Sequence, residues 1–144
     1  MGTDAFDPRA LLAERNLGVL ATLHRDGRAQ LSPVTPFYEP AEERIHISTR
    51  AGLVKANNLL QDPRAALNVT SADGRSWATA EGTATLTGPG DDPHGPVVEA
   101  LVEYYRKAAG EHPDWAEYRT AMVTDRRVLL TIEVQHVYGA TLRG

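Results

Sequence analysis

Cationic and hydroxyl side chains gather in the stretch STRAGLVKANNLLQDPRA, residues 48–65. Ser48 and Arg50 come immediately before a short predicted helix, and Lys55 lies near its start. Hydroxyls, a guanidinium and free backbone N–H groups at the positive end of a helix dipole are the groups that bind a phosphate. A solvated helix face is the more ordinary interpretation of such a pattern. Taken alone, the stretch leaves both an anion site and a solvated face open.

Other kinds of reactive site find little support in the sequence. The chain has no cysteine, which excludes disulfides, thiolate nucleophiles, zinc fingers and iron–sulfur clusters. Its five histidines show no HxH or HExxH spacing, and there is no GxSxG, Walker or strand-borne GxGxxG motif. We therefore expect no metal site, and the catalytic residues are unknown at this stage.

The composition is that of a globular protein with an acidic balance. The chain has 144 residues, of which 42% are apolar and 24% charged, with a net charge of -4. This size predicts one domain over residues 1–144. The negative charge argues against nucleic acid, and no apolar run reaches the roughly twenty residues of a membrane span. The polar start does not resemble a signal peptide, so we expect a cytoplasmic protein with no membrane partner.

The expected element order is that of a mainly antiparallel β-protein with inserted helices. Strands are predicted over 17–23, 28–38, 44–49, 65–70, 76–87 and 127–134, with 137–141 as a continuation. Helices are predicted after Asp7-Pro8, after residue 52, and over 96–109 and 113–123. Pro33 and Pro36 mark an edge or interrupted strand, and Gly82 predicts a bulge. This order favours a small closed or half-open barrel over a βαβ fold.

The helix that follows the third strand is predicted to present polar residues at the surface. The residue before proline avoids the α region, so Asp62-Pro63 ends this helix. Lys55 and Asn58 lie together on one side of a helical wheel. The opposite, predicted buried side is formed by Leu53, Ala56, Leu59 and Leu60. The wheel therefore predicts that Lys55 and Asn58 share a surface.

Four segments resemble the flavin/deazaflavin oxidoreductases of the pyridoxamine-phosphate-oxidase-like split-barrel superfamily. They are NLGVLATLHRDGRAQLSPV, IHISTRAGLVKANNLLQDPRAALNV, WATAEGTATL and AEYRTAMVTDRRVLLTIEVQHVYG. The most specific pieces are the K-x-x-N-L-x-x-D-P-R-A run at Lys55–Ala65 and the MVTDRRVLL run at Met122–Leu130. Within the superfamily, the chain is most similar to the actinobacterial branch that uses the deazaflavin coenzyme F420.

This resemblance implies a mainly β split barrel with inserted helices, assembled as a homodimer with cofactor sites between the subunits. It implies a coenzyme F420-dependent oxidoreductase that transfers a hydride from the reduced deazaflavin to a small organic acceptor. In the family, the lysine matching Lys55 meets the cofactor phosphate. The other residues implied in cofactor binding are Ser48 and Arg50 near the phosphate, Asn58 one turn on, Gln30, Ser32 and Val34 along the ring, and Trp77 and Arg127 from the other subunit.

One departure from the family pattern and two alternatives accompany this expectation. Pro33 stands where close relatives would carry asparagine or another hydrogen-bonding residue, and proline has no N–H, so one ring contact is missing or replaced. FMN is the alternative cofactor, because the same phosphate pocket would serve it. A non-catalytic deazaflavin- or haem-binding protein is the alternative outside enzymes, and haem would need an axial ligand near a large apolar pocket.

Overall fold

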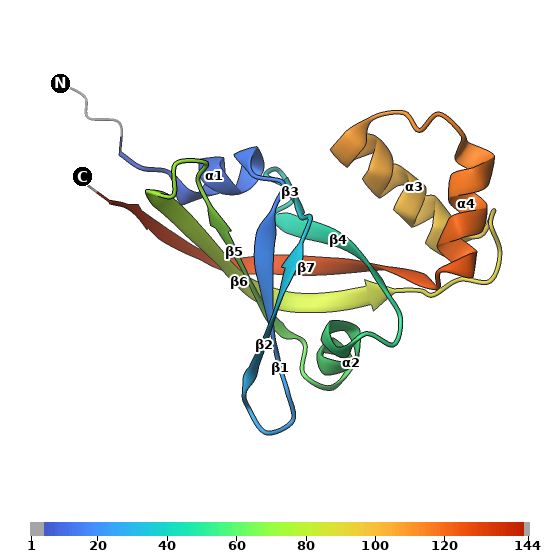
Figure 1. The fold of residues 1–144 in the computed structure, drawn as a ribbon, viewed down its shortest axis with the longest axis horizontal. Helices are drawn as coiled ribbons and strands as arrows, with labels where there is room; N and C mark the ends of the chain where they lie inside the picture. The colour runs from blue at the N-terminus through green and yellow to red at the C-terminus, as the bar shows by residue number, and fades with distance from the viewer. Residues whose placement is uncertain (1–4, 143–144) are drawn as a thin grey trace.

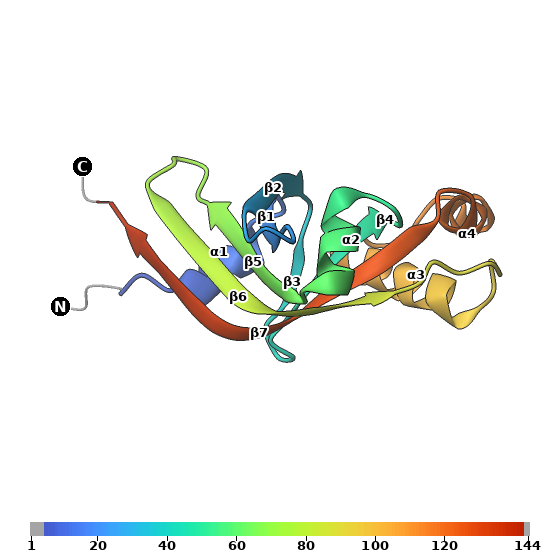
Figure 2. The ribbon, with the colours of Figure 1, turned by 90° about the horizontal axis from the view of Figure 1, so that it is seen from below.

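The computed structural model describes residues 5–142, and its centre is one seven-stranded antiparallel sheet with the order β2-β1-β5-β6-β7-β4-β3. The strands are β1 (Gly18–Leu23), β2 (Ala29–Val34), β3 (Phe37–Glu39), β4 (Arg44–Arg50), β5 (Arg64–Thr70), β6 (Ser76–Thr87) and β7 (Arg127–Thr141). Figures 1 and 2 show that the long strands β6 and β7 curve strongly, so that the sheet wraps around its core. The predicted mainly β fold with inserted helices is confirmed.

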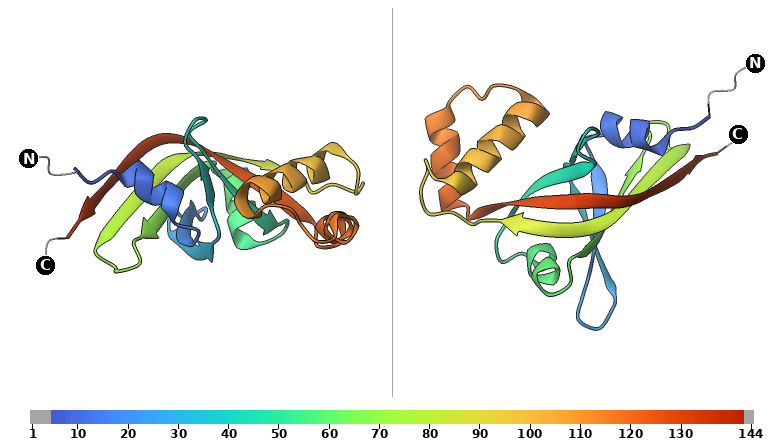
Figure 3. Two further views of the ribbon diagram at one scale, coloured as in Figure 1. Left: turned by 90° about the horizontal axis from the view of Figure 1, so that it is seen from above. Right: turned by 180° about the vertical axis from the view of Figure 1, so that it is seen from behind.

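Four helices lie around this sheet. They are α1 (Pro8–Glu14), α2 (Val54–Gln61), α3 (Pro96–Ala109) and α4 (Trp115–Thr124). As predicted, Asp7 caps α1, since its side chain accepts a hydrogen bond from the Arg9 backbone N–H at 3.0 Å, and Pro8 opens the helix. The two views of Figure 3 show α3 and α4 as a pair beyond one end of the sheet, with α1 at the other end.

The segment predicted as one returning strand forms two strands at opposite edges of the sheet. β2 pairs with β1, whereas β3 pairs with β4 at the far edge. Pro33 lies within β2, and Pro36 lies in the connection between the two strands. A proline removes one N–H from the ladder, which an edge strand tolerates. The expectation of an interrupted edge strand is therefore confirmed, while 127–141 forms the single strand β7.

The core lies on the concave side of the sheet and follows the alternation of β4 and β5. Leu20, Ile45, Leu67 and Leu130 are at most 1% exposed. A second cluster packs α3 and α4 against β7, and its buried members are Val98, Leu101, Val102, Tyr118 and Leu129. This second cluster fixes the position of the two helices that form one wall of the site described below.

Glu43, in the turn before β4, joins α1 to the sheet. Arg9 Nε donates to its carboxylate at 3.1 Å, and the Tyr38 hydroxyl donates to the same group. These two hydrogen bonds, that from Arg9 first, hold the pKa of Glu43 below its ordinary value of 4.5. A carboxyl whose pKa is lowered by folding stabilises the fold above its unfolded pKa, and this contribution is lost as the pH falls through the lowered value.

We therefore expect Glu43→Gln to reduce the loss of stability on acidification. The measurement is urea unfolding of both proteins at neutral pH and at a pH below 4.5, the ordinary pKa of Glu43. Exposed Glu103 supplies the matched control, Glu103→Gln, which is expected to follow the wild type. The same loss of stability in Glu43→Gln as in the wild type would contradict the assigned role of Glu43.

Candidate functional site

A surface groove of about 530 Å³ lies where β2, β4, α2 and the α3–α4 pair meet. Its polar side comes from the end of β4 and the first turn of α2, with Ser48, Arg50 and Lys55. Arg127, the first residue of β7, also lines it. The helical wall is formed by Tyr104, Tyr105, Tyr118 and Met122. We call this feature the cationic groove, because three cationic side chains converge in a chain of negative net charge.

The turn between β4 and α2 brings Lys55 beside Arg50. The Ala51 backbone N–H donates to the Arg126 carbonyl at 2.9 Å, and Gly52 then turns the chain with a φ of 88°. A φ in this region favours glycine. Leu53 is the N-cap of α2 and provides no side-chain hydrogen bond. The first N–H groups of the helix therefore have no side-chain cap, which suits an anion beside Lys55.

Arg127 faces Arg50 across the β4–β7 ladder. Its Nε is buried and has no hydrogen-bond partner among residues 5–142. A buried donor without a partner costs about 1–3 kcal/mol, so an anion in the cationic groove would remove this cost. The sequence assigned Arg127 to the site of the other subunit. The β4–β7 register also brings Arg127 into the cationic groove of its own chain, and its contribution to a partner's site stays a prediction.

Two tyrosines of the helical wall, Tyr104 and Tyr118, donate hydrogen bonds to backbone carbonyls. The Tyr118 hydroxyl donates to the Leu101 carbonyl at 3.0 Å, and burial raises its pKa to about 12. The Tyr104 hydroxyl donates to the Thr35 carbonyl at 3.4 Å, and burial raises its pKa as well. These residues escaped the sequence-based prediction because aromatic residues at helical spacing are more often core than ligand contacts.

The three predicted residues of β2 lie on one side of that strand, but only one lines the cationic groove. Val34 is among its lining residues. Ser32 Oγ is buried and has no hydrogen-bond partner in the described part of the chain. The Gln30 side-chain oxygen accepts from Thr22 Oγ1 at 3.3 Å. Val34 and the unpartnered Ser32 hydroxyl thus remain candidates for ring contacts, whereas Gln30 already has a partner.

Asn58 does not share a surface with Lys55, so the helical-wheel prediction is wrong here. Asn58 is 7% exposed, and its Nδ2 donates to Thr22 Oγ1 at 3.1 Å inside the barrel. Leu60, assigned to the buried side, is 74% exposed. The physical reason is that α2 lies against β1, where the inward amide of Asn58 pairs with the buried Thr22 hydroxyl. Asn58 therefore braces the helix that carries Lys55.

Trp77 lies far from the cationic groove of its own chain. It is near the start of β6, whereas the groove adjoins α3, which follows the end of that strand. Its ring packs edge-on against Tyr138 at a centroid distance of 5.8 Å. Any contact of Trp77 with a cofactor would therefore require a second subunit, as the sequence predicts.

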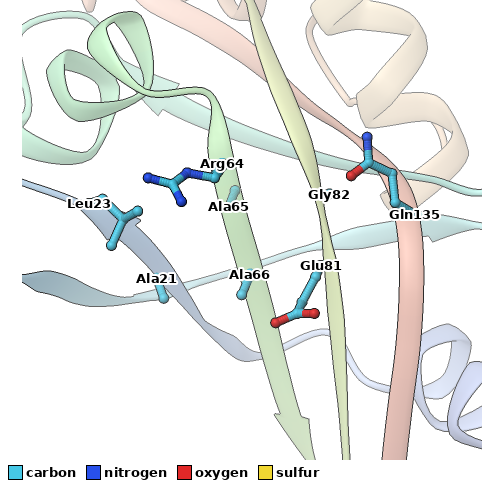
Figure 4. A pocket seen from close by; sticks show the side chains of 8 residues that line it. All are labelled: Ala21, Leu23, Arg64, Ala65, Ala66, Glu81, Gly82 and Gln135. Carbon is cyan, nitrogen blue, oxygen red and sulfur yellow. The ribbon is translucent and has the colours of Figure 1, made fainter. Parts of the chain in front are cut away.

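A separate hollow of about 380 Å³ lies over β1, β5, β6 and β7 (Figure 4). Half of its lining residues are small, and Ala21 and Ala66 are paired through the register of β1 and β5. Arg64 lies at one side, where its guanidinium is already paired with Asp62 at 2.7 Å. The hollow thus has one paired cation and the carboxylate of Glu81, whereas three cations line the cationic groove, and we do not assign the hollow to the anionic cofactor.

Neither a metal cluster nor a membrane-spanning helix is present among residues 5–142. Residues 5–142 contain no group of three or more His, Asp or Glu side chains that could hold a metal ion. No histidine lines the cationic groove, and His46 is instead held by Glu39 at 2.6 Å. None of the helices in this range has the length and hydropathy needed to cross a bilayer.

Comparison with known proteins gives a consistent picture. A curated relative, the F420H(2)-dependent biliverdin reductase of Mycobacterium tuberculosis, is 28% identical over 93% of this chain and 86% of its own. A conserved hypothetical protein of the same species has a TM-score of 0.69 at 22% identity, covering 92% of this chain and 81% of the other. A structure described as an F420 reductase has a TM-score of 0.65 at 20% identity, covering 93% and 98%.

These structures share the split-barrel fold that the sequence predicts, since both TM-scores hold over nearly the whole chain. The family model described as pyridoxamine 5'-phosphate oxidase matches residues 8–140, which include every strand except the last residue of β7. The chain belongs to the pyridoxamine 5'-phosphate oxidase family.

Proposed function

We propose that this protein is a coenzyme F420-dependent oxidoreductase that binds its cofactor in the cationic groove. The observation that carries the proposal is the buried, unpartnered Nε of Arg127, which stands with Arg50 and Lys55 around one groove. A relative that is 28% identical over 93% of the chain is an F420-dependent reductase by name, which supports the same cofactor.

The residues of the cationic groove divide into anion-binding and ring-binding groups. Lys55, Arg50 and Arg127 hold the phosphate and the anionic tail, with Ser48 and the uncapped start of α2 as further donors. Val34 and Tyr104 form apolar walls that exclude water from the ring. When bound, the reduced deazaflavin supplies a hydride to an electron-poor carbon of the acceptor, which takes its matching proton from solvent.

The two candidate cofactors, F420 and FMN, differ in their negative charge. FMN carries one phosphate, whereas F420 carries a phosphate and a tail of several carboxylates. Three cationic side chains in one groove therefore suit F420 better than FMN. A haem-binding function has less support, because no histidine lines the groove and the hydroxyls of Tyr104 and Tyr118 are already bonded to backbone carbonyls.

Turnover distinguishes an enzyme from a deazaflavin carrier. Reduced F420 is mixed with a small panel of electron-poor quinones and conjugated alkenes, with and without the protein, and its oxidation is followed by absorbance. We expect protein-dependent oxidation with at least one acceptor class. Tight binding without protein-dependent oxidation of F420 by any acceptor would identify a carrier instead.

We further propose that two chains associate through the convex face of the sheet. Alternation and register place Leu31, Val19 and Tyr138 on this face, and they are 64%, 39% and 39% exposed. Ala21 and the ring of Trp77 belong to the same face. A homodimer would bury these apolar groups and would allow Trp77 to reach the partner's site.

The absence of cysteine in such an enzyme suits the cytoplasm.

Light scattering tests the proposed association. We expect the wild type to have twice the mass of one chain, and Leu31→Glu to shift toward the monomer because it places a charge in the apolar interface. Val54→Glu changes a half-exposed apolar residue of α2, away from this face, and is expected to remain dimeric. A monomeric wild type would overturn the proposal.

A further inference from the structure

A third cavity, of about 490 Å³, is lined by the C-terminal end of α1, the start of β3 and the last turns of α3. Figure 1 shows β3 between these two helices. The lining of this cavity comes from residues 13–16, from the β2–β3 connection with the start of β3, and from the last two turns of α3. The volume falls within the range of about 300–1,000 Å³ that is typical of small-molecule sites. We call it the α1–α3 cavity.

Four aromatic residues contribute to the walls of the α1–α3 cavity. Phe37, Tyr38, Tyr104 and Tyr105 line it together. Two of the hydroxyls are already engaged, because Tyr38 donates to Glu43 and Tyr104 donates to the Thr35 carbonyl. Tyr38 is also only 5% exposed, so the ring surface that a ligand can contact comes mainly from Phe37, Tyr104 and Tyr105. Ring surfaces of this kind favour a flat, conjugated molecule.

One charged group of the α1–α3 cavity has a donor without a partner. Arg15 lines the cavity, and its Nε is buried with no hydrogen-bond partner among residues 5–142. A guanidinium is always charged and pairs with a carboxylate through two parallel hydrogen bonds. The neighbouring Glu14 also lines the cavity but is exposed to solvent, so water screens its charge. The cavity thus combines aromatic side chains with one cationic donor, Arg15 Nε, that can bind an anion.

The α1–α3 cavity adjoins the cationic groove. Thr35, Tyr104 and Tyr105 line both, so molecules bound in the two places would be neighbours. Hydride transfer requires donor and acceptor carbons in close contact, which such neighbouring sites allow. We propose that the α1–α3 cavity is the acceptor subsite and that it takes flat, conjugated carboxylates through Arg15. Its role as an acceptor subsite rests on the proposed function, but its binding preference does not.

Binding of two matched aromatic probes tests this preference without cofactor or turnover. 2-Naphthoate and 2-naphthamide share one ring system and differ in the carboxylate, and their affinities are measured by isothermal titration calorimetry. We expect the wild type to prefer 2-naphthoate by about tenfold or more, from a charge-assisted hydrogen bond. Arg15→Gln is expected to remove this preference and leave 2-naphthamide binding unchanged, while Arg15→Lys keeps part of it.

Arg75→Gln is the matched control, because Arg75 is an exposed residue of the β5–β6 turn and the charge change is the same. Thermal melts and the affinity for F420 are measured for each variant and are expected to match the wild type. Equal affinity of the wild type for the two probes, or an unchanged preference in Arg15→Gln, would overturn the inference. Failure of F420 to bind would instead overturn the proposed function and leave the probe preference standing.

Discussion

Replacing Lys55 by alanine is expected to weaken F420 binding by about 1.5–3 kcal/mol, which corresponds to about a 10- to 150-fold higher Kd. Lys55 supplies a charge-assisted hydrogen bond to an anion at the start of α2, and no uncharged neighbour can replace it. The fold should remain intact, because the lysine is only half-buried and packs at the edge of the helix. Fluorescence titration with F420 and a thermal melt measure both effects.

The chain contains a matched control for this substitution, because Lys107 is its only other lysine. Lys107 pairs with Glu39 of β3 at 3.3 Å and does not line the cationic groove. Lys107→Ala removes the same charge and is expected to leave the Kd for F420 unchanged. Equal affinities of Lys55→Ala and the wild type for F420 would contradict the assigned role of Lys55. They would show that this side of α2 is an ordinary solvated helix face, which the sequence also allows.

A large effect on stability is expected for Gly82→Ala. Gly82 lies at the register shift between β6 and β7, and an added Cβ would stand 2.0 Å from the Glu133 carbonyl oxygen. Backbone on both strands would have to move, which costs about 1–3 kcal/mol when a packed region is overfilled. Urea unfolding should show a lower midpoint for the variant than for the wild type.

Thr85→Ala, three residues along the same strand, separates this clash from a general effect of altering β6. Thr85 is exposed, so its substitution is expected to change stability by no more than about 0.5 kcal/mol. A Gly82→Ala midpoint as high as that of Thr85→Ala would show that the bulge accepts a side chain.

Local signals predicted most of the fold. Proline within β2 and in the β2–β3 connection indicated interrupted edge strands, and Gly82 indicated the bulge, because both residues act through the backbone at their own position. Which strands pair with each other could not be predicted from such local signals. That β3 pairs with β4 and not with β1 depends on where the chain crosses the barrel, and one residue type cannot carry that information.

In the candidate site, too, residues close in sequence were placed correctly, whereas placements that depend on long-range pairing were not predicted. Ser48, Arg50 and Lys55 are close in sequence, and the cationic groove brings them together as predicted. Asn58 was misplaced because hydrophobicity alone does not reveal the buried Thr22 that satisfies its amide. The resemblance implied Arg127 as a contact from the other subunit, whereas its place beside Arg50 in its own chain follows only from the β4–β7 register. Side chains that act across such long-range pairings require the fold before they can be placed.

Titration of the purified protein with F420 and, separately, with FMN tests the central claim most directly. Fluorescence reports both ligands, and the Lys107→Ala control verifies that one lost charge outside the groove has no effect. We predict micromolar or tighter binding of F420 and weaker binding of FMN, because three cations face the more anionic cofactor. Tighter binding of FMN, or binding of neither cofactor, would contradict the account.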